Sequence, residues 1–137
     1  MSNTVPQALE DVDTLGDLTR FHARQRPGDE AMLFEGRSTS YADLDRHASQ
    51  VANGLLADGL EPGARVGFMD KNSDHFYEIV FGCAKSNTVS VGINWRLAPP
   101  EVAYILNDSQ AEVLFVGPDF YGLAEQIRSD VPSLKRI

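Results

Sequence analysis

The chain has 137 residues and a mass of 15.1 kDa, enough for one modest domain with its own core. It carries 20 acidic and 12 basic residues, and its net charge of -8 at pH 7 argues against a nucleic-acid or anionic-membrane partner. No apolar run approaches the roughly 20 residues that span a bilayer, and no signal-peptide pattern opens the chain, so we expect a cytoplasmic protein without a transmembrane segment.

The first third of the sequence predicts a helix followed by a hairpin. Residues 1–13 are polar and acidic, and we expect them to be a flexible lead-in. Thr14 is suited to cap a helix that ends near Arg26, before a proline. Short runs at 31–35 and 37–41 flank a single glycine, which predicts two antiparallel strands joined by a tight turn.

A second helix should follow the hairpin at once. Ser40 with Asp43 three residues later resembles a capping box, and Gly59 is a natural C-terminal stop, which together predict a helix over residues 41–58. Its core face consists of apolar residues at helical spacing: Leu44, Ala48, Val51, Ala52 and Leu55.

Strands and helices then alternate to the end of the chain. We expect strands at 65–70, 88–94 and 112–116, helices at 73–86, 99–108 and 119–130, and the start of another strand at 134–137. This alternation predicts right-handed crossovers and a parallel sheet with helices on its faces, so the fold class is α/β with a small antiparallel hairpin. The β-branched run at 88–94 predicts a strand covered on both faces.

Two stretches carry a family resemblance. Residues 88–109, TVSVGINWRLAPPEVAYILNDS, resemble the second core motif of the adenylate-forming acyl-CoA synthetases, and residues 39–44, TSYADL, resemble the first. The matching positions of the second motif are Asn94, Arg96, Leu97, Glu101, Tyr104, Ile105, Leu106, Asp108 and Ser109. The resemblance covers residues 14–116, with Trp95 as a departure, because many relatives have a small residue or proline there.

The resemblance implies that residues 14–137 are the N-terminal α/β segment of the AMP-binding domain of a longer enzyme, so that Ile137 is a cut. Such a parent converts a fatty acid or another hydrophobic carboxylate, with ATP, Mg²⁺ and coenzyme A, into acyl-CoA, AMP and pyrophosphate. The family's phosphate loop and later catalytic motifs do not occur in this sequence. We therefore expect a scaffold piece that is inactive alone, with no catalytic, cofactor-binding or metal-binding residue.

Two other hypotheses about the function remain open. One is a stand-alone binding or assembly module. The other is a fragment of an adenylation domain that serves a carrier protein, which is disfavoured because residues 92–97 lack the proline-rich sequence that follows the strand in those domains.

The cysteine and the three histidines do not form a recognisable catalytic or metal-binding pattern. Cys83, the only cysteine, continues an apolar helical face, which indicates a buried core thiol rather than a nucleophile. His22, His47 and His75 lie on three different predicted helices without ligand spacing, which argues against a metal site. Asp43 and His47 are four residues apart, so we expect them to form a surface pair.

Other polar and aromatic candidates follow the predicted strands. Residues 70–73, DKNS, come after a parallel strand and form either a helix-capping loop, which we favour, or a ligand contact. Arg96 should pair with Glu101 rather than face a ligand, and Trp95 and Tyr104 should serve packing rather than line an acyl tunnel.

A truncated parallel sheet leaves a strand without its neighbour. We expect residues 112–116 and the stub at 134–137 to be open, and the chain to self-associate through them or to be only marginally stable.

Overall fold

The computed structural model describes residues 12–137 of the chain. The expected flexible lead-in over residues 1–13 lies outside the described residues except for its last two positions. Within the described part, no helix combines the length and the apolar character needed to cross a bilayer.

The N-terminal part contains the predicted helices and hairpin. Helix α1, Leu15–Gln25, begins at Thr14, whose side chain accepts from the backbone N–H of Asp17 while the Asp17 carboxylate accepts from the backbone of Thr14. Strands β1, Glu30–Phe34, and β2, Arg37–Ser40, form an antiparallel hairpin. Its turn residues Glu35 and Gly36 both have positive φ, as the tight hairpin turn requires.

Helix α2, Tyr41–Ala57, starts at the predicted cap, where the Ser40 hydroxyl accepts from the Asp43 N–H. A polar network joins it to α1 and to α3, Asp74–Ser86. Lys85, whose side chain is only 3% exposed, donates to Asp45 of α2 over 2.5 Å and to Ser49 over 3.0 Å. Thr19 of α1 donates to the same carboxylate over 2.7 Å. The three helices therefore share one carboxylate–ammonium contact, in which the ammonium is buried and the carboxylate is partly exposed.

The sheet has three parallel strands in the order β4-β3-β5. These are β3, Arg65–Met69, β4, Val89–Gly92, and β5, Ala111–Val116. Helix α4, Pro99–Ser109, opens on two prolines as predicted. The helix expected at 119–130 is divided into a 3-10 turn, Pro118–Phe120, helix α5, Tyr121–Ile127, and a second 3-10 turn, Arg128–Asp130.

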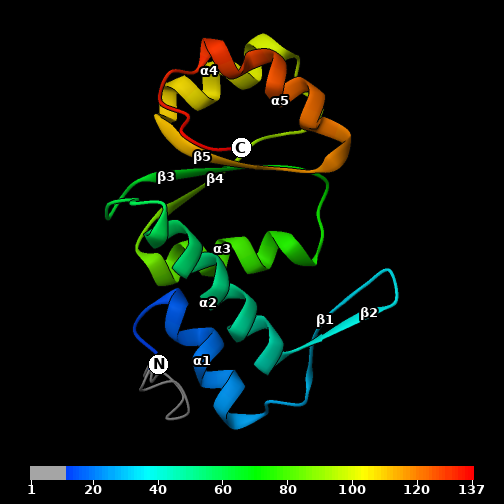
Figure 1. Ribbon diagram of the computed structural model, residues 1–137. Helices are drawn as coiled ribbons and strands as arrows, with labels where there is room; N and C mark the ends of the chain where they lie inside the picture. Colours follow the sequence, from blue (N-terminus) through cyan, green and yellow to red (C-terminus); the bar gives the residue numbers. More distant parts are fainter. Residues whose placement is uncertain (1–11) are drawn as a thin grey trace, which may run out of the picture.

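Helices cover both faces of the sheet, so the α/β prediction is confirmed. Figure 1 shows α4 and α5 on one face and α2 and α3 on the other, with α1 beyond them. The core on the α4 and α5 side includes Met69, Leu106 and Leu114, and the core on the α2 and α3 side includes Val66 and Phe68. The alternation of β3 thus sends successive side chains into two separate cores.

The two sheet edges differ from the expectation. Strand β4 is not covered on both faces: it is an edge strand, and Val89 is 49% exposed. The outer edge of β5 is not open along its whole length, because Val113 forms a parallel bridge with Arg136 and the Leu114 N–H donates to the Arg136 carbonyl over 3.0 Å. The predicted strand start at 134–137 therefore pairs with β5, and β4 is the edge that the described residues leave unpaired.

Candidate functional site

The sheet order defines a crevice at the carboxyl ends of β3 and β5. The chain leaves β3 toward β4 on one side and later returns to β5 on the other, and open α/β sheets bind ligands where the strand order reverses in this way. The crevice has a volume of about 300 Å³. Its lining combines apolar and titratable residues from two strands, two helices and the segments that follow the strands: Val51, Phe68, Asp70, His75, Glu78, Ile79, Phe115, Val116, Gly117 and Pro118.

Asp70 is one of the charged residues that line the crevice. Its carboxylate accepts from the Lys71 N–H over 2.7 Å. Ser73 stands at the N-cap of α3 but makes no side-chain capping hydrogen bond, so the helix-capping loop predicted for residues 70–73 lacks its side-chain cap. The carboxyl group lies directly against Gly117, where the Cβ of any other residue would collide with it. A glycine at position 117 is therefore required for the loops after β3 and β5 to approach this closely.

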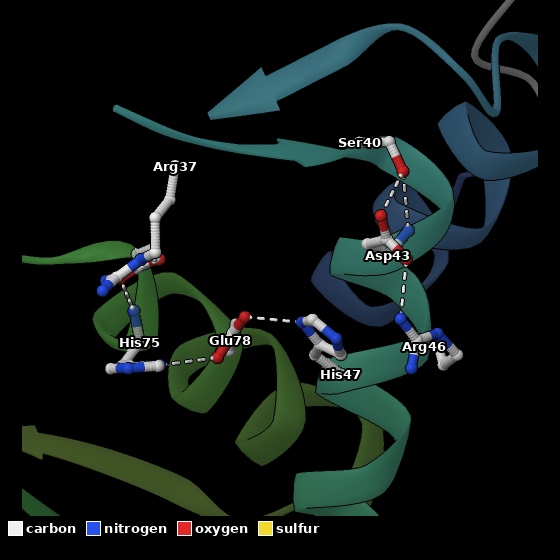
Figure 2. Close-up of polar contacts among 8 residues, drawn as sticks. Arg37, Ser40, Asp43, Arg46, His47, His75 and Glu78 are labelled. Atoms are coloured by element: carbon white, nitrogen blue, oxygen red, sulfur yellow. Dashed lines mark hydrogen bonds and ion pairs between the residues drawn. The ribbon is translucent and has the colours of Figure 1, made fainter. Parts of the chain in front are cut away.

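A histidine–carboxylate cluster borders the crevice, to whose lining it contributes His75 and Glu78. The Nδ1 of His47, on α2, lies 2.7 Å from one oxygen of Glu78, and the Nδ1 of His75 lies 3.0 Å from the other. Figure 2 shows Glu78 between the two rings. The two histidines lie on separate helices, as predicted, but nothing in the sequence indicated that one carboxylate would join them. Only the packing of α2 against α3 brings them together.

Arg37 of the hairpin is tied to the same helix. Its guanidinium forms an ion pair with Asp74, with the closest N–O distance 2.8 Å. Burial by itself would raise the pKa of Asp74, but the hydrogen bond from Arg37 and the charges of His75 and Arg37 outweigh burial and lower it. Asp74 therefore stays ionised at the start of α3, where a negative charge is favourable.

The expected Asp43–His47 pair is wrong. Asp43 accepts from the Ser40 hydroxyl over 2.9 Å and from Arg46 over 2.7 Å, while His47 turns to Glu78 (Figure 2). Hydrogen bonds from Arg46 and then Ser40 lower the pKa of Asp43. Ser40 at the helix cap and Arg46 one turn later therefore take up the Asp43 carboxylate, and His47 does not contact it.

An aromatic cluster lies beyond the loop after β3. Lys71 Nζ is 3.3 Å from the Asp119 carboxylate and 5.7 Å from the ring centroid of Trp95. Trp95 is half-buried and its ring lies 5.6 Å from that of Phe120, so its predicted packing role is confirmed. Tyr104 is 70% exposed, so the same prediction is wrong for that residue.

Arg96 does not pair with Glu101 as expected. The guanidinium stacks on Trp95, 4.1 Å from the ring centroid. Glu101 accepts instead from the Ala98 N–H over 2.8 Å, because a carboxylate three residues into a helix can satisfy the unpaired backbone donor at its start.

The described residues contain no cluster of metal ligands. In residues 12–137 no three His, Cys, Asp or Glu side chains gather as metal ligands, and the sequence has no glycine-rich loop that ends in lysine. Cys83 is 1% exposed, and burial raises the pKa of its thiol, which confirms the expected core position.

Comparison with known proteins identifies the family. Residues 19–137 match the AMP-binding enzyme family, and the chain belongs to it. The chain is 46% identical over 121 residues to a fatty acid–[acyl-carrier-protein] ligase, ScoC, of Streptomyces coeruleorubidus, and 37% identical over 105 residues to a feruloyl-CoA synthase of an Amycolatopsis species. These matches cover 88% and 77% of this chain.

Solved structures of the same family share the fold. The anthranilate CoA ligase AuaEII, in complex with anthranoyl-AMP, superposes on 90% of this chain with a TM-score of 0.86 and 32% identity. The N-terminal domain of FACL13 from Mycobacterium tuberculosis gives a TM-score of 0.85 and 30% identity over the same share. The chain spans about a quarter of the length of such relatives, 23% of ScoC and 25% of AuaEII.

Proposed function

We propose that residues 14–137 are the N-terminal α/β segment of an enzyme that activates a hydrophobic carboxylic acid and joins it to a thiol. The overall reaction would consume the acid, ATP and the thiol and yield a thioester, AMP and pyrophosphate. The family match over residues 19–137 carries this proposal, and the likeness to a ligase bound to an acyl-adenylate supports it.

Within such an enzyme this segment contributes structure. Its polar groups at the carboxyl ends of β3 and β5 are bonded largely to one another, as in the Glu78 contacts with His47 and His75. ATP, Mg²⁺ and coenzyme A would be held by residues outside this segment. A cytoplasmic location and a part in fatty acid metabolism belong to the same proposal.

The thiol acceptor has two candidates. Coenzyme A is favoured by relatives such as the feruloyl-CoA synthase, and an acyl carrier protein is favoured by the 46% identity to ScoC. The turn sequence Gly92–Leu97 argued against a carrier-protein adenylation domain of the peptide-synthetase kind, but it does not separate these two acceptors.

The test uses the longest protein that the reading frame through these residues encodes. It should be incubated with ATP, Mg²⁺ and decanoate or ferulate, with either coenzyme A or a phosphopantetheinylated carrier protein, and the products identified by mass spectrometry. We expect an acyl-adenylate without thiol and a thioester with one of the two acceptors. A folded protein that forms neither product with any acid of a broad panel would contradict the proposal.

A further inference from the structure

Hydrogen bonds attach the hairpin of β1 and β2 to the helices at its base and near its tip. At the base, the Tyr41 N–H donates to the Asp29 carbonyl over 3.0 Å, and β2 runs directly into α2. Near the tip, Arg37 reaches from β2 to the start of α3 (Figure 2). Its Nη2 donates to both oxygens of Asp74, over 2.8 and 3.0 Å, and its Nε donates over 3.2 Å. A two-stranded hairpin is only marginally stable by itself in water, so its order depends on such attachments.

The packing between the hairpin and the first turn of α3 is incomplete. A space of about 150 Å³ lies between them. Residues of β1, of the loop after β3 and of α3 line it: Met32, Leu33, Phe34, Asn72, Ser73, Asp74 and Tyr77. Leu33 is 65% exposed and Tyr77 is 50% exposed. Apolar burial between the two elements is therefore only partial, and the contact relies largely on the ion pair between Arg37 and Asp74.

The contact also buries a hydroxyl group that has no partner. The Ser73 oxygen is buried, and it forms no hydrogen bond to any group of residues 12–137. Ser73 is the N-cap residue of α3, where a serine hydroxyl commonly accepts from the first turn, but here it makes no such bond. Burial without a partner destabilises this arrangement relative to one in which water reaches the hydroxyl.

The ion pair and the buried hydroxyl act in opposite directions on the same contact. We propose that residues 30–40 form a flap that opens from the first turn of α3, with the Arg37–Asp74 ion pair favouring the closed state and the unpaired Ser73 hydroxyl favouring the open state. The flap turns about its base, where the register of the two strands shifts between Glu30 and Met32 as at a β-bulge. This equilibrium is a property of the 137-residue chain and does not depend on the proposed function.

Amide hydrogen exchange of the 137-residue chain at pH 7, measured by NMR, tests the flap. Because opening releases a hairpin that is marginally stable alone, we expect its amides to exchange at least about tenfold faster than those of β3, which report global unfolding. Ile127→Val, a core truncation in α5 on the other face of the sheet, should speed exchange in β3 about threefold and leave exchange in the hairpin unchanged.

A pair of arginine variants tests the ion pair. Arg37→Gln should speed hairpin exchange about tenfold, because it removes charge-assisted hydrogen bonds to a carboxylate that is only 7% exposed. Arg128→Gln is the matched control, because it breaks the exposed pair with Glu125 far from the hairpin. It should leave hairpin exchange within about twofold.

A pair of serine variants tests the buried hydroxyl. Ser73→Ala removes the hydroxyl that closure leaves without a partner, so hairpin exchange should slow at least about fivefold. Ser40→Ala, at the N-cap of α2, is the matched control. It removes a hydroxyl that accepts from the Asp43 N–H over 3.1 Å, and it should lower the thermal unfolding temperature. If the Ser73 hydroxyl capped α3 in the same way, Ser73→Ala would also lower this temperature and would not slow hairpin exchange.

Three results would overturn the proposal, once thermal unfolding has established that each variant is folded. Hairpin amides that exchange as slowly as those of β3 would show that the hairpin does not open without global unfolding. Equal hairpin exchange in Arg37→Gln and Arg128→Gln would show that the ion pair does not hold the flap closed. Hairpin exchange in Ser73→Ala that is as fast as in the wild type, or faster, would show that the hydroxyl does not favour opening.

Discussion

At the scale of single residues, the sole thiol of the chain reports on the packing of α3. Cys83 is 1% exposed in the core between the sheet and α2 and α3, and burial raises its pKa. Both effects slow reaction with a thiol reagent, because the attacking species is an exposed thiolate. We predict slow labelling of the native protein and fast labelling in urea. Equal labelling rates in the native and urea-unfolded states would show that Cys83 on α3 does not face the core.

The contact between Asp45 and Lys85 should matter more than any surface pair. Asp45→Asn leaves the buried ammonium without its counter-charge, and we predict a loss of about 2 kcal/mol at pH 7. This is below the roughly 3–5 kcal/mol of a fully buried pair, because Asp45 is partly exposed. Glu125→Gln, which breaks an exposed pair with Arg128, should cost less than about 0.5 kcal/mol. Equal losses of unfolding free energy for Asp45→Asn and Glu125→Gln, measured by urea unfolding, would contradict a special role for the Asp45–Lys85 contact.

The same carboxylate gives the stability a pH dependence. Burial alone would raise the pKa of Asp45, but hydrogen bonds from Lys85 and Thr19 outweigh it and lower the folded pKa. Its contribution is therefore complete above the unfolded pKa of about 3.9 and is lost as the pH falls through the lower folded value. The free energy of unfolding of Asp45→Asn should fall less steeply below about pH 4 than that of the wild type.

At the scale of elements, the close approach of α2 and α3 depends on Gly82. A Cβ there would lie 2.5 Å from Val51 Cγ1 and 3.1 Å from the Ala48 carbonyl. We predict that Gly82→Ala destabilises the fold by about 1–3 kcal/mol, despite the better helix propensity of alanine. Gly54→Ala in α2, where a Cβ meets nothing within 4 Å, should stabilise it by about 0.5–1 kcal/mol. If Gly82→Ala raised the thermal unfolding temperature, the close approach of α2 and α3 at Gly82 would be wrong.

Elements with local signals were predictable from the sequence. The caps at Thr14 and Ser40, the turn at Gly36 and the two prolines of α4 act within a few residues, and the structure contains the helices and hairpin that they predict. The burial of a strand depends on its neighbours. The β-branched run of β4 therefore predicted a strand correctly and its two-sided burial wrongly.

Contacts between elements were not predictable in the same way. The joining of His47 and His75 by Glu78 depends on the packing of two helices, which no spacing along the chain reveals. The Arg96 side chain had an acidic neighbour in the sequence and an aromatic neighbour in space, and the stacking on Trp95 prevailed because Glu101 caps its own helix.

At the scale of the whole molecule, the edge of β4 that residues 12–137 leave unpaired should promote association. The strand carries the half-exposed Val89 and has no lysine, proline or bulge to protect its edge. The charge of -8 resists association only over a screening length of about 8 Å at physiological salt. We predict concentration-dependent dimers in sedimentation velocity, which Val89→Lys should weaken and Leu56→Lys, on α2, should not. A monomer at all concentrations would contradict this.

We propose that this chain supplies structure to an acyl-activating enzyme and does not itself carry out the reaction. The most direct measurement is pyrophosphate release by the purified 137-residue chain with ATP, Mg²⁺, coenzyme A and a panel of fatty and aromatic acids. We predict release at the level of the protein-free blank, because the described residues form no metal-ligand cluster and the sequence has no phosphate loop. Acid-dependent release above the blank that co-elutes with the folded chain would contradict the claim.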